Sequence, residues 1–312
     1  MTAYIIRRLL YMVPIVFGIL LLTFVLFNLI GGDPSIDMAG KGASAETIAE
    51  IRAEYGLDKP LFFSWDSQFT NHFKNALTFR FGRARDRELV TDKILRGAGP
   101  SLSLMVPMFL VTIAISISLS LAVAFMRGSK WDTMIVVVCV AGMSLPYLSF
   151  ILFGQYFFAY KLGWFPVFFS HDLSTAQYVA LPVIIGIAAG LGGNLRFYRT
   201  VMLDEMRADY VRTAFAKGLT TSRVLFKHVL KNAMIPIITQ IILAIPFLFL
   251  GSLLLERFFG IPGLGYLMIE AIGSRDYFVI SAMTFISAIL YVVFNVITDV
   301  CYALVDPRVS FD

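Results

Sequence analysis

Apolar residues in this chain come in long blocks, and the polar residues gather between the blocks instead of alternating with them. A run of roughly 20 apolar residues is the length that an α-helix needs to cross the hydrocarbon core of a bilayer. The pattern therefore predicts an all-α membrane protein with six transmembrane helices. We place these helices at about 9–30, 102–126, 133–160, 178–195, 233–255 and 279–304.

Two of the blocks have features of their own. The third is long and carries Pro146 near its middle, which predicts a kink because proline lacks the backbone N–H and clashes with the preceding turn. The first follows Arg7 and Arg8, as a secretory signal would. It is too long for the apolar region of a signal, which spans roughly 7 to 15 residues, so we interpret it as a retained helix.

The orientation follows from the Lys and Arg residues in the short loops, which are enriched on the cytoplasmic side. A cytoplasmic N-terminus places most of these basic residues inside and predicts that both termini are cytoplasmic. The inner set is Arg7, Arg8, Arg127, Lys130, Arg196, Arg199, Arg207, Arg212, Lys217, Arg223, Lys227, Lys231 and Arg308. The opposite short loops hold Lys161, Arg257 and Arg275. The net charge of +5 is thus a topology signal, and no nucleic-acid partner is indicated.

The segment 31–100 then forms a small external subdomain with equal numbers of acidic and basic residues. Thr47 and Glu50 fit a capping box at a helix start, and Gly56 is a plausible helix stop. Further on, Trp65, Phe69, Phe73 and Leu77 recur at helical spacing. This stripe suits a helix that packs on the transmembrane helices, or one that lies on the outer membrane surface or against a partner.

Residues typical of catalysis are sparse. His72, His171 and His228 are far apart and have no metal-ligand spacing, and Cys139 and Cys301 fall within predicted helices, where small buried side chains are expected. No Gly-rich loop followed by Lys and Ser or Thr is present, so the chain is not expected to bind ATP through a P-loop. The sequence predicts a non-catalytic protein without a cofactor or metal of its own.

Ionisable residues are also rare inside the predicted spans. Asp299 lies near the cytoplasmic end of the last helix, and Glu256 lies at the outer edge of the fifth. A cation-driven transporter usually carries carboxylates near the membrane midplane, so their scarcity disfavours that class. The fourth block carries Gly186 and Gly190, whose spacing lets helices approach closely, either within this chain or at a subunit interface around a pore.

The cytoplasmic segment 200–232 is long for a connection between helices. It predicts a short amphipathic helix, a turn at Gly218 and a second helix that enters the membrane. Val211, Ala214, Phe215 and Leu219 form the predicted apolar face. Such a face, turned toward the cytosol, favours a soluble partner that covers it.

This segment resembles the cytoplasmic loop of ABC importer permeases, in the form found in the dipeptide, oligopeptide and nickel permease family. The words that carry the resemblance are Tyr210-Val-Arg-Thr-Ala214, Ala216-Lys-Gly-Leu219 and Lys227-His-Val-Leu-Lys-Asn-Ala-Met-Ile-Pro236. Similar words occur in order along nearly the whole chain, among them Gly32-Asp-Pro34, Leu162-Gly-Trp-Phe-Pro166 and Ile261-Pro-Gly-Leu-Gly265. Where the generic loop has Glu-Ala-Ala, this chain has Arg212-Thr-Ala214.

The resemblance implies a type I-like permease fold with a cytoplasmic coupling helix. It implies a second, similar permease subunit, two cytoplasmic ATPases that bind ATP and Mg²⁺, and an external substrate-binding protein. The implied substrate is a short peptide, with nickel chelates, glutathione or another small solute as alternatives. The implied coupling residues are Tyr210, Val211, Arg212, Ala214, Phe215, Lys217, Gly218 and Leu219. A secondary transporter or channel working alone, or a membrane scaffold without transport, are the competing classes.

Overall fold

The structure is a computed structural model that describes residues 2–30, 32–40 and 42–305. Arg308, which the orientation argument includes, lies outside these residues, as do the side chains of Asp299 and Cys301. Within the described residues the regular elements are helices, apart from an isolated bridge between Arg83 and Leu89. The chain is therefore an all-α membrane protein, as its hydrophobic pattern predicts.

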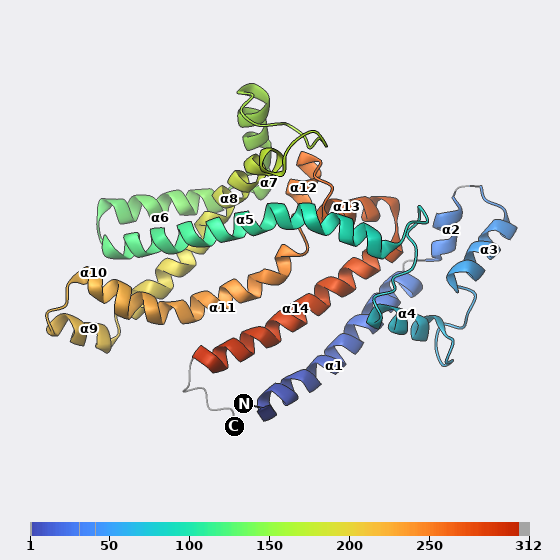
Figure 1. Ribbon diagram of the computed structural model, residues 1–312, viewed down its shortest axis with the longest axis horizontal. Coiled ribbons are helices and arrows are strands. Elements are labelled where there is room, and N and C mark those ends of the chain that lie inside the picture. The colour runs from blue at the N-terminus through green and yellow to red at the C-terminus, as the bar shows by residue number, and fades with distance from the viewer. Residues whose placement is uncertain (1, 31, 41, 306–312) are drawn as a thin grey trace.

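Five helical segments of the described chain are long and apolar enough to cross a bilayer: Leu10–Asn28, Val90–Phe125, Thr175–Glu205, Thr221–Leu248 and Tyr277–Thr298. The elements that form them are α1 (Thr2–Phe24) with η1 (Val25–Ile30), α5 (Val90–Phe125), α8 (Thr175–Glu205), α10 (Thr221–Val224) with η3 (Leu225–Val229) and α11 (Leu230–Leu248), and α14 (Tyr277–Val305). In Figure 1 these helices run along the length of the molecule, where α5 packs on α8, and α14 packs on both α11 and α1.

The third predicted helix is a broken one. It consists of α6 (Lys130–Met143), α7 (Tyr147–Gly154) and η2 (Gln155–Lys161), and its two parts meet at an angle of 92°. The break falls at Pro146, where the backbone leaves the helical region with ψ at 140°. The kink predicted at this proline is confirmed, but it is much sharper than a tilted single span. Six spans result only if the bent pair counts as one.

The fifth predicted helix ends earlier than its apolar run. Its helix stops at Leu248, and Gly251 adopts a φ of +68° that breaks the path of the chain. Ser252 then caps a new helix, α12 (Leu253–Phe259), by accepting the N–H of Leu255 at 3.3 Å. The helix α13 (Leu264–Ser274) follows. The residues across this break are apolar, so hydropathy alone predicts one helix where the backbone forms two, α11 and α12.

The second and fourth helices are longer than predicted. The helix α5 begins at Val90 rather than near 102, and α8 continues to Glu205. The added turns of α5 carry the charged residues Asp92, Lys93 and Arg96. Charged turns can remain helical outside the bilayer, but they do not register in an apolar pattern.

Near its C-terminal end, α8 is joined to α6 by an ion pair. The guanidinium of Arg199 donates two hydrogen bonds of 3.0 Å to the carboxylate of Asp132, and Asp132 also accepts the N–H of Gly128 at 3.1 Å. Asp132 is buried, so the bidentate pair satisfies a carboxylate that would otherwise be costly to desolvate. The contact fixes the turn between α5 and α6 against α8.

The segment predicted to form an external subdomain contains α2 (Pro34–Ala39), α3 (Ala45–Tyr55) and α4 (Gln68–Leu77). The capping box predicted at Thr47 is wrong, because α3 begins earlier, and the Oγ of Ser44 accepts the N–H of Thr47 at 3.2 Å. Serine is a favourable N-cap residue, but Ser44 lies before the apolar positions from which the helix start was predicted. The predicted stop at Gly56 is confirmed, with a φ of +67°.

The helix α4 lies against the outer part of α1. The ring centroids of Phe69 and Phe24 are 5.3 Å apart, and Phe73 contacts Phe17 at 6.1 Å. The middle of the predicted stripe therefore packs on a transmembrane helix. Its ends do not, because Trp65 precedes α4 and is 97 % exposed, and Leu77 is half exposed.

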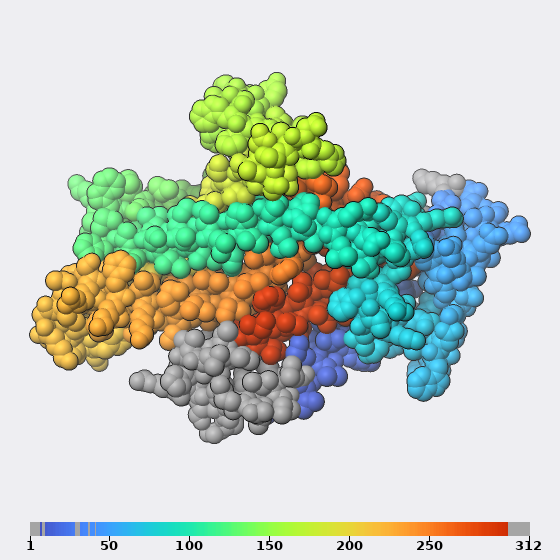
Figure 2. Space-filling view, in the orientation of Figure 1, coloured from blue at the N-terminus to red at the C-terminus, as the bar shows by residue number. Residues whose placement is uncertain are grey.

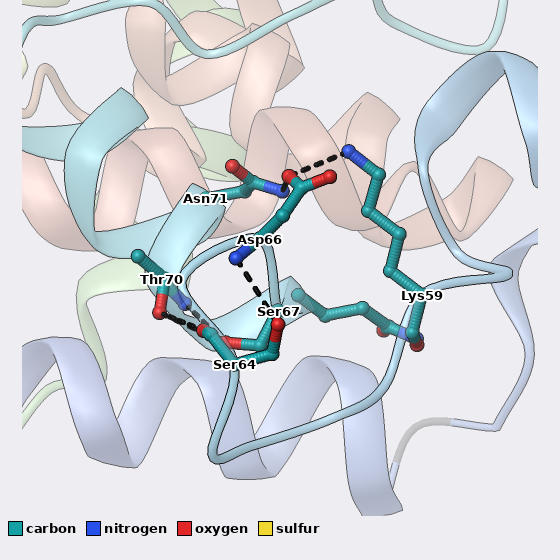
Figure 3. Close-up of polar contacts among 7 residues, drawn as sticks. Lys59, Ser64, Asp66, Ser67, Thr70 and Asn71 are labelled. Carbon is teal, nitrogen blue, oxygen red and sulfur yellow. Dashed lines mark hydrogen bonds and ion pairs between the residues drawn. The ribbon is translucent and has the colours of Figure 1, made fainter.

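Polar contacts hold the loop that leads into α4 (Figure 3). Asp66 accepts hydrogen bonds from the Nζ of Lys59 at 2.7 Å and from the Nδ2 of Asn71 at 2.9 Å, and Ser67 caps the helix by accepting the N–H of Thr70 at 3.1 Å. Further along, the charged segment 81–88 is tied to the start of α14. The N–H of Arg85 donates to Asp276 at 2.8 Å. The external subdomain is thereby fixed to both ends of the chain.

Candidate functional site

The predicted cytoplasmic amphipathic helix is present as α9 (Asp209–Ala216). It ends in a turn in which the N–H of Gly218 donates to the carbonyl of Phe215 at 2.9 Å, and the N–H of Leu219 to that of Ala214 at 3.3 Å. Gly218 has a φ of +76°, so the positive-φ turn expected at this glycine is confirmed. The chain then enters α10, η3 and α11.

The apolar side of α9 faces the protein's own interior. Val211 is 1 % exposed and Ala214 is 4 % exposed, and Leu219 packs beside them. They share a cluster with Tyr198 and Met202 of α8, and with residues of η3 and α11. The prediction that the whole apolar face meets the cytosol is therefore wrong for these three residues. The extension of α8 supplied the surface that covers them, and the apolar pattern had placed the end of that helix about three turns earlier.

A different set of side chains is exposed on α9 and just after it. Phe215 is 42 % exposed and Tyr210 is 38 % exposed, and Phe226 of η3 is 61 % exposed. The charged side chains of Arg212 and Lys217 are exposed on the same short segment. Figures 1 and 2 place this segment at one end of the molecule, at the left, with the external helices α2 and α3 at the right. Exposed aromatic residues with a charged rim are typical of protein interfaces.

Tyr210 connects the first turn of α9 to the rest of the chain. Its hydroxyl donates a hydrogen bond to the carboxylate of Glu205, the last residue of α8, and also contacts the side chain of Asn232 in α11. Partial burial, together with the neighbouring Glu205 carboxylate, raises the pKa of Tyr210 to about 12. The phenol is therefore a stable donor at physiological pH. Through it and the Val211 cluster, α9 is held to both α8 and α11.

Two sequence families match this chain. Residues 113–311 match the family described as binding-protein-dependent transport system inner membrane component, and residues 1–85 match the N-terminal region described for the same kind of protein. The first match covers more than half of the chain. The protein belongs to the family of binding-protein-dependent inner-membrane permeases.

Several relatives align with this chain from end to end. The oligopeptide transport system permease protein AppB of Bacillus subtilis (strain 168) is 37 % identical over 320 residues. The glutathione transport system permease protein GsiC of Escherichia coli (strain K12) is 32 % identical over 312 residues. A putative peptide transport system permease protein of Brucella abortus (strain 2308) is 33 % identical over 319 residues. Each alignment covers 100 % of both chains.

The permease also has a buried polar site between α5 and the α12–α13 hairpin, which sequence reasoning missed. Glu256 of α12 is fully buried, and its carboxylate accepts hydrogen bonds from the Oγ of Ser101 at 2.7 Å and from the N–H groups of Ser252 and Tyr266 at 3.0 Å each. The Oγ of Ser101 in turn accepts the N–H of Leu264 at 2.7 Å. Each carboxylate oxygen of Glu256 thus has a backbone N–H donor, although burial raises the pKa of this carboxyl above its ordinary value.

Glycines make room for this site. A Cβ on Gly251 or Gly263 would clash with the Glu256 carboxylate and with Ser101, and one on Gly97 would lie 3.2 Å from the backbone of Gly263. The close approach of α5 to the α12–α13 hairpin thus requires glycine, which has no Cβ, at these three positions. The only sequence signal was a lone glutamate between apolar residues, with glycines on both sides. The apolar run had placed Glu256 at the edge of a helix rather than in a protein interior.

Proposed function

We propose that this permease forms half of the translocation pathway of an ATP-driven importer of short peptides. Family membership supports the importer class, and two relatives that align over the whole chain, an oligopeptide permease and a glutathione permease, support the substrate class. Glutathione is itself a small peptide, so both names point to one kind of solute. The other half would be a second, similar permease. Nickel chelates remain the alternative substrate.

The contact with the ATPases is proposed to lie on the exposed side of α9. The observation that carries this proposal is the 42 % exposed Phe215 beside the buried Val211 and Ala214. An exposed aromatic on a helix whose opposite side is fixed in the protein can receive a partner without losing its own support. ATP and Mg²⁺ would be bound by the partner subunits.

Coupling would then be mechanical. When two ATPases close around ATP, they would displace α9, and α9 would carry α8 and α11 because Tyr210 and the Val211 cluster connect it to both helices. The helices α8 and α11 both cross the membrane. A rigid-body movement of this kind can alternate the side from which a cavity between two permeases is open. An external binding protein would deliver the substrate.

The proposed orientation places α9 and the starts of α1 and α6 in the cytoplasm, and α2 to α4 outside. The supporting observation is the distribution of Lys and Arg, which are far more numerous on the α9 side in the short loops. Figure 1 shows α9 and α2 at opposite ends of the molecule.

Reconstitution tests the proposed function. The chain is purified alone, and together with the second permease and the ATPases encoded beside it. We expect the chain alone to bind neither ATP nor a tripeptide, and the full assembly in liposomes to take up labelled trialanine when ATP and the binding protein are supplied. Saturable ATP hydrolysis by the single chain would refute the proposal that separate subunits bind and hydrolyse ATP. An assembly that hydrolyses ATP but imports only nickel chelates would refute the peptide substrate.

A further inference from the structure

Two cavities in the membrane part of the chain share a wall. One, of about 320 Å³, lies between α5, α8 and α11, and the other, of about 480 Å³, lies between α8, α11 and the break between α6 and α7. Asn194 of α8 and Gln240 of α11 line both cavities. Two amide side chains therefore stand where the two cavities meet.

Gln240 is the most unusual of the lining residues. It lies within the membrane span Thr221–Leu248 and is exposed. Among the described residues its side-chain amide has no hydrogen-bond partner. An unpaired amide facing lipid tails costs several kcal/mol, on the order of 4 or more for transfer to a hydrocarbon. Such a group is tolerated in a membrane helix when it faces a polar cavity or a binding partner.

The facing side of α8 offers further polar groups. Gly190, Asn194 and Tyr198 recur every four residues and so lie on one face of the helix. The Nδ2 of Asn194 donates to the carbonyl of Gly190 at 3.1 Å, which leaves the amide oxygen and a second N–H of Asn194 for other partners. Tyr198 lines the smaller cavity and is only 1 % exposed, yet no described residue forms a hydrogen bond with its hydroxyl.

Other polar groups at these cavities are already paired. The hydroxyl of Thr112 donates to the carbonyl of Met108 at 2.6 Å, within its own helix. Gly193 lines the larger cavity, and a Cβ built on it would meet nothing within 4 Å, so the space beside this glycine is open. The groups with hydrogen-bonding capacity left are therefore the amide of Gln240, part of the amide of Asn194 and the phenol of Tyr198, all uncharged and beside open space.

We propose that Asn194, Gln240 and Tyr198 bind the main-chain amides of a peptide as it passes through the permease. A carboxamide side chain offers a donor and an acceptor side by side, which is what a peptide group presents in return. Uncharged groups of this kind recognise the backbone and leave the peptide's side chains free to vary. This inference rests on the proposed function, because it identifies the substrate contacts within the proposed pathway.

The competing occupant is a helix of the second permease, since amide side chains also form hydrogen bonds between membrane helices. Tyr198 disfavours that occupant. Its side chain lines the smaller cavity but is only 1 % exposed, and a neighbouring helix cannot enter a space of about 320 Å³. A peptide in extended form can be threaded through such a space, one residue at a time.

The test uses the complete importer in liposomes, with labelled trialanine and with a trialanine N-methylated at its two peptide bonds. We expect Gln240→Leu to lower the trialanine uptake rate about tenfold, as the loss of a buried hydrogen bond predicts. Gln240→Asn should restore part of it. Thr239→Val is the matched control, because Thr239 neighbours Gln240 but its hydroxyl donates to the carbonyl of Ile235 at 3.0 Å. For wild type, the N-methylated peptide should be the poorer substrate, and Gln240→Leu should abolish that difference.

The possible outcomes separate this inference from the function on which it rests. A Gln240→Leu importer that takes up trialanine at the wild-type rate overturns the inference alone. So does a variant that loses the second permease during purification, because the amide would then be an interface contact. A wild-type importer that hydrolyses ATP but carries neither peptide overturns the proposed substrate class, and the inference with it.

Discussion

The side chains of Ser101 and Glu256, which are 155 residues apart in the sequence, meet at 2.7 Å between Oγ and Oε1 inside the protein. Ser101 belongs to the outer half of α5, and Glu256 to the short helix that follows α11. The contact therefore fixes the α12–α13 hairpin on a transmembrane helix.

Removal of the Ser101 hydroxyl should destabilise the permease. Ser101→Ala leaves the buried Glu256 carboxylate and the N–H of Leu264 each without one partner, which should cost about 2 kcal/mol of unfolding free energy. Thermal unfolding of the purified protein in detergent measures this. Ser103→Ala is the control, because the Ser103 hydroxyl donates only to the carbonyl of Pro100 in its own helix, and its midpoint should stay close to wild type. Equal midpoints for both variants would contradict the role of the Ser101 contact.

The two sides of α9 should respond differently to a carboxylate. Phe215→Asp should leave insertion and pairing with the second permease intact, but abolish transport and release the ATPases during purification. An aromatic contact of this kind contributes on the order of 2 kcal/mol, and desolvating a carboxylate adds a penalty at least as large. Val211→Asp, on the buried side, should instead lower the yield of folded protein. A Phe215→Asp assembly with bound ATPases and normal uptake would remove α9 as the coupling element.

Gly218 allows a test of backbone strain alone. A Cβ at this position meets nothing within 4 Å, but its φ of +76° is unfavourable for a β-branched residue. Gly218→Val should therefore cost roughly 1–2 kcal/mol and weaken ATPase retention in co-purification. Gly218→Asn should be well tolerated, because asparagine adopts this conformation more readily. Equal losses in both variants would indicate a packing role instead.

The external subdomain should lose stability on acidification because of His72. Burial lowers the pKa of His72 to about 4 from an ordinary value of 6.5, and its Nε2 lies 3.3 Å from the Oγ1 of Thr23. The unfolded chain then binds a proton that the folded protein does not, so stability is full above pH 6.5 and falls as the pH drops toward 4. The loss should be on the order of 3 kcal/mol. In His72→Gln, the thermal midpoint should vary less with pH between these two values than it does in the wild type. An unchanged pH dependence of the midpoint would disprove this assignment to His72.

Labelling of introduced cysteines checks the orientation. In a background where Cys139 and Cys301 are alanine, Ser44→Cys and Thr220→Cys should react with impermeant maleimides from opposite sides of the membrane. Both positions are exposed, so accessibility does not limit either reaction. Labelling of both positions from outside intact cells would rule out the proposed topology.

Much of the fold was predictable because bilayer crossing imposes a single strong pattern on the sequence. The blocks around Leu10–Asn28 and Tyr277–Thr298 were located within a few residues. The failures have local causes. A sharp break at Pro146 and a stop before Gly251 both lie inside continuous apolar runs, where hydropathy contains no information about backbone direction.

The candidate site was predicted in its location but not in its packing. The α9 helix and the turn at Gly218 followed from amphipathic spacing and from one glycine. Which side of α9 would be buried depended on how far α8 continues past its apolar part, because the apolar pattern does not report this charged extension. The Ser101–Glu256 contact joins residues far apart in the sequence, and no local rule pairs them.

The division of α9 into a held side and a free side has a consequence for how such importers can be re-engineered. The groups that anchor the helix, Val211, Ala214 and the hydroxyl of Tyr210, are distinct from its exposed aromatic ring at Phe215. Substitutions on the free side leave the interior packing untouched. Under the proposed role of α9, a permease could be adapted to the ATPases of another importer by grafting a few surface positions, with no redesign of its membrane core.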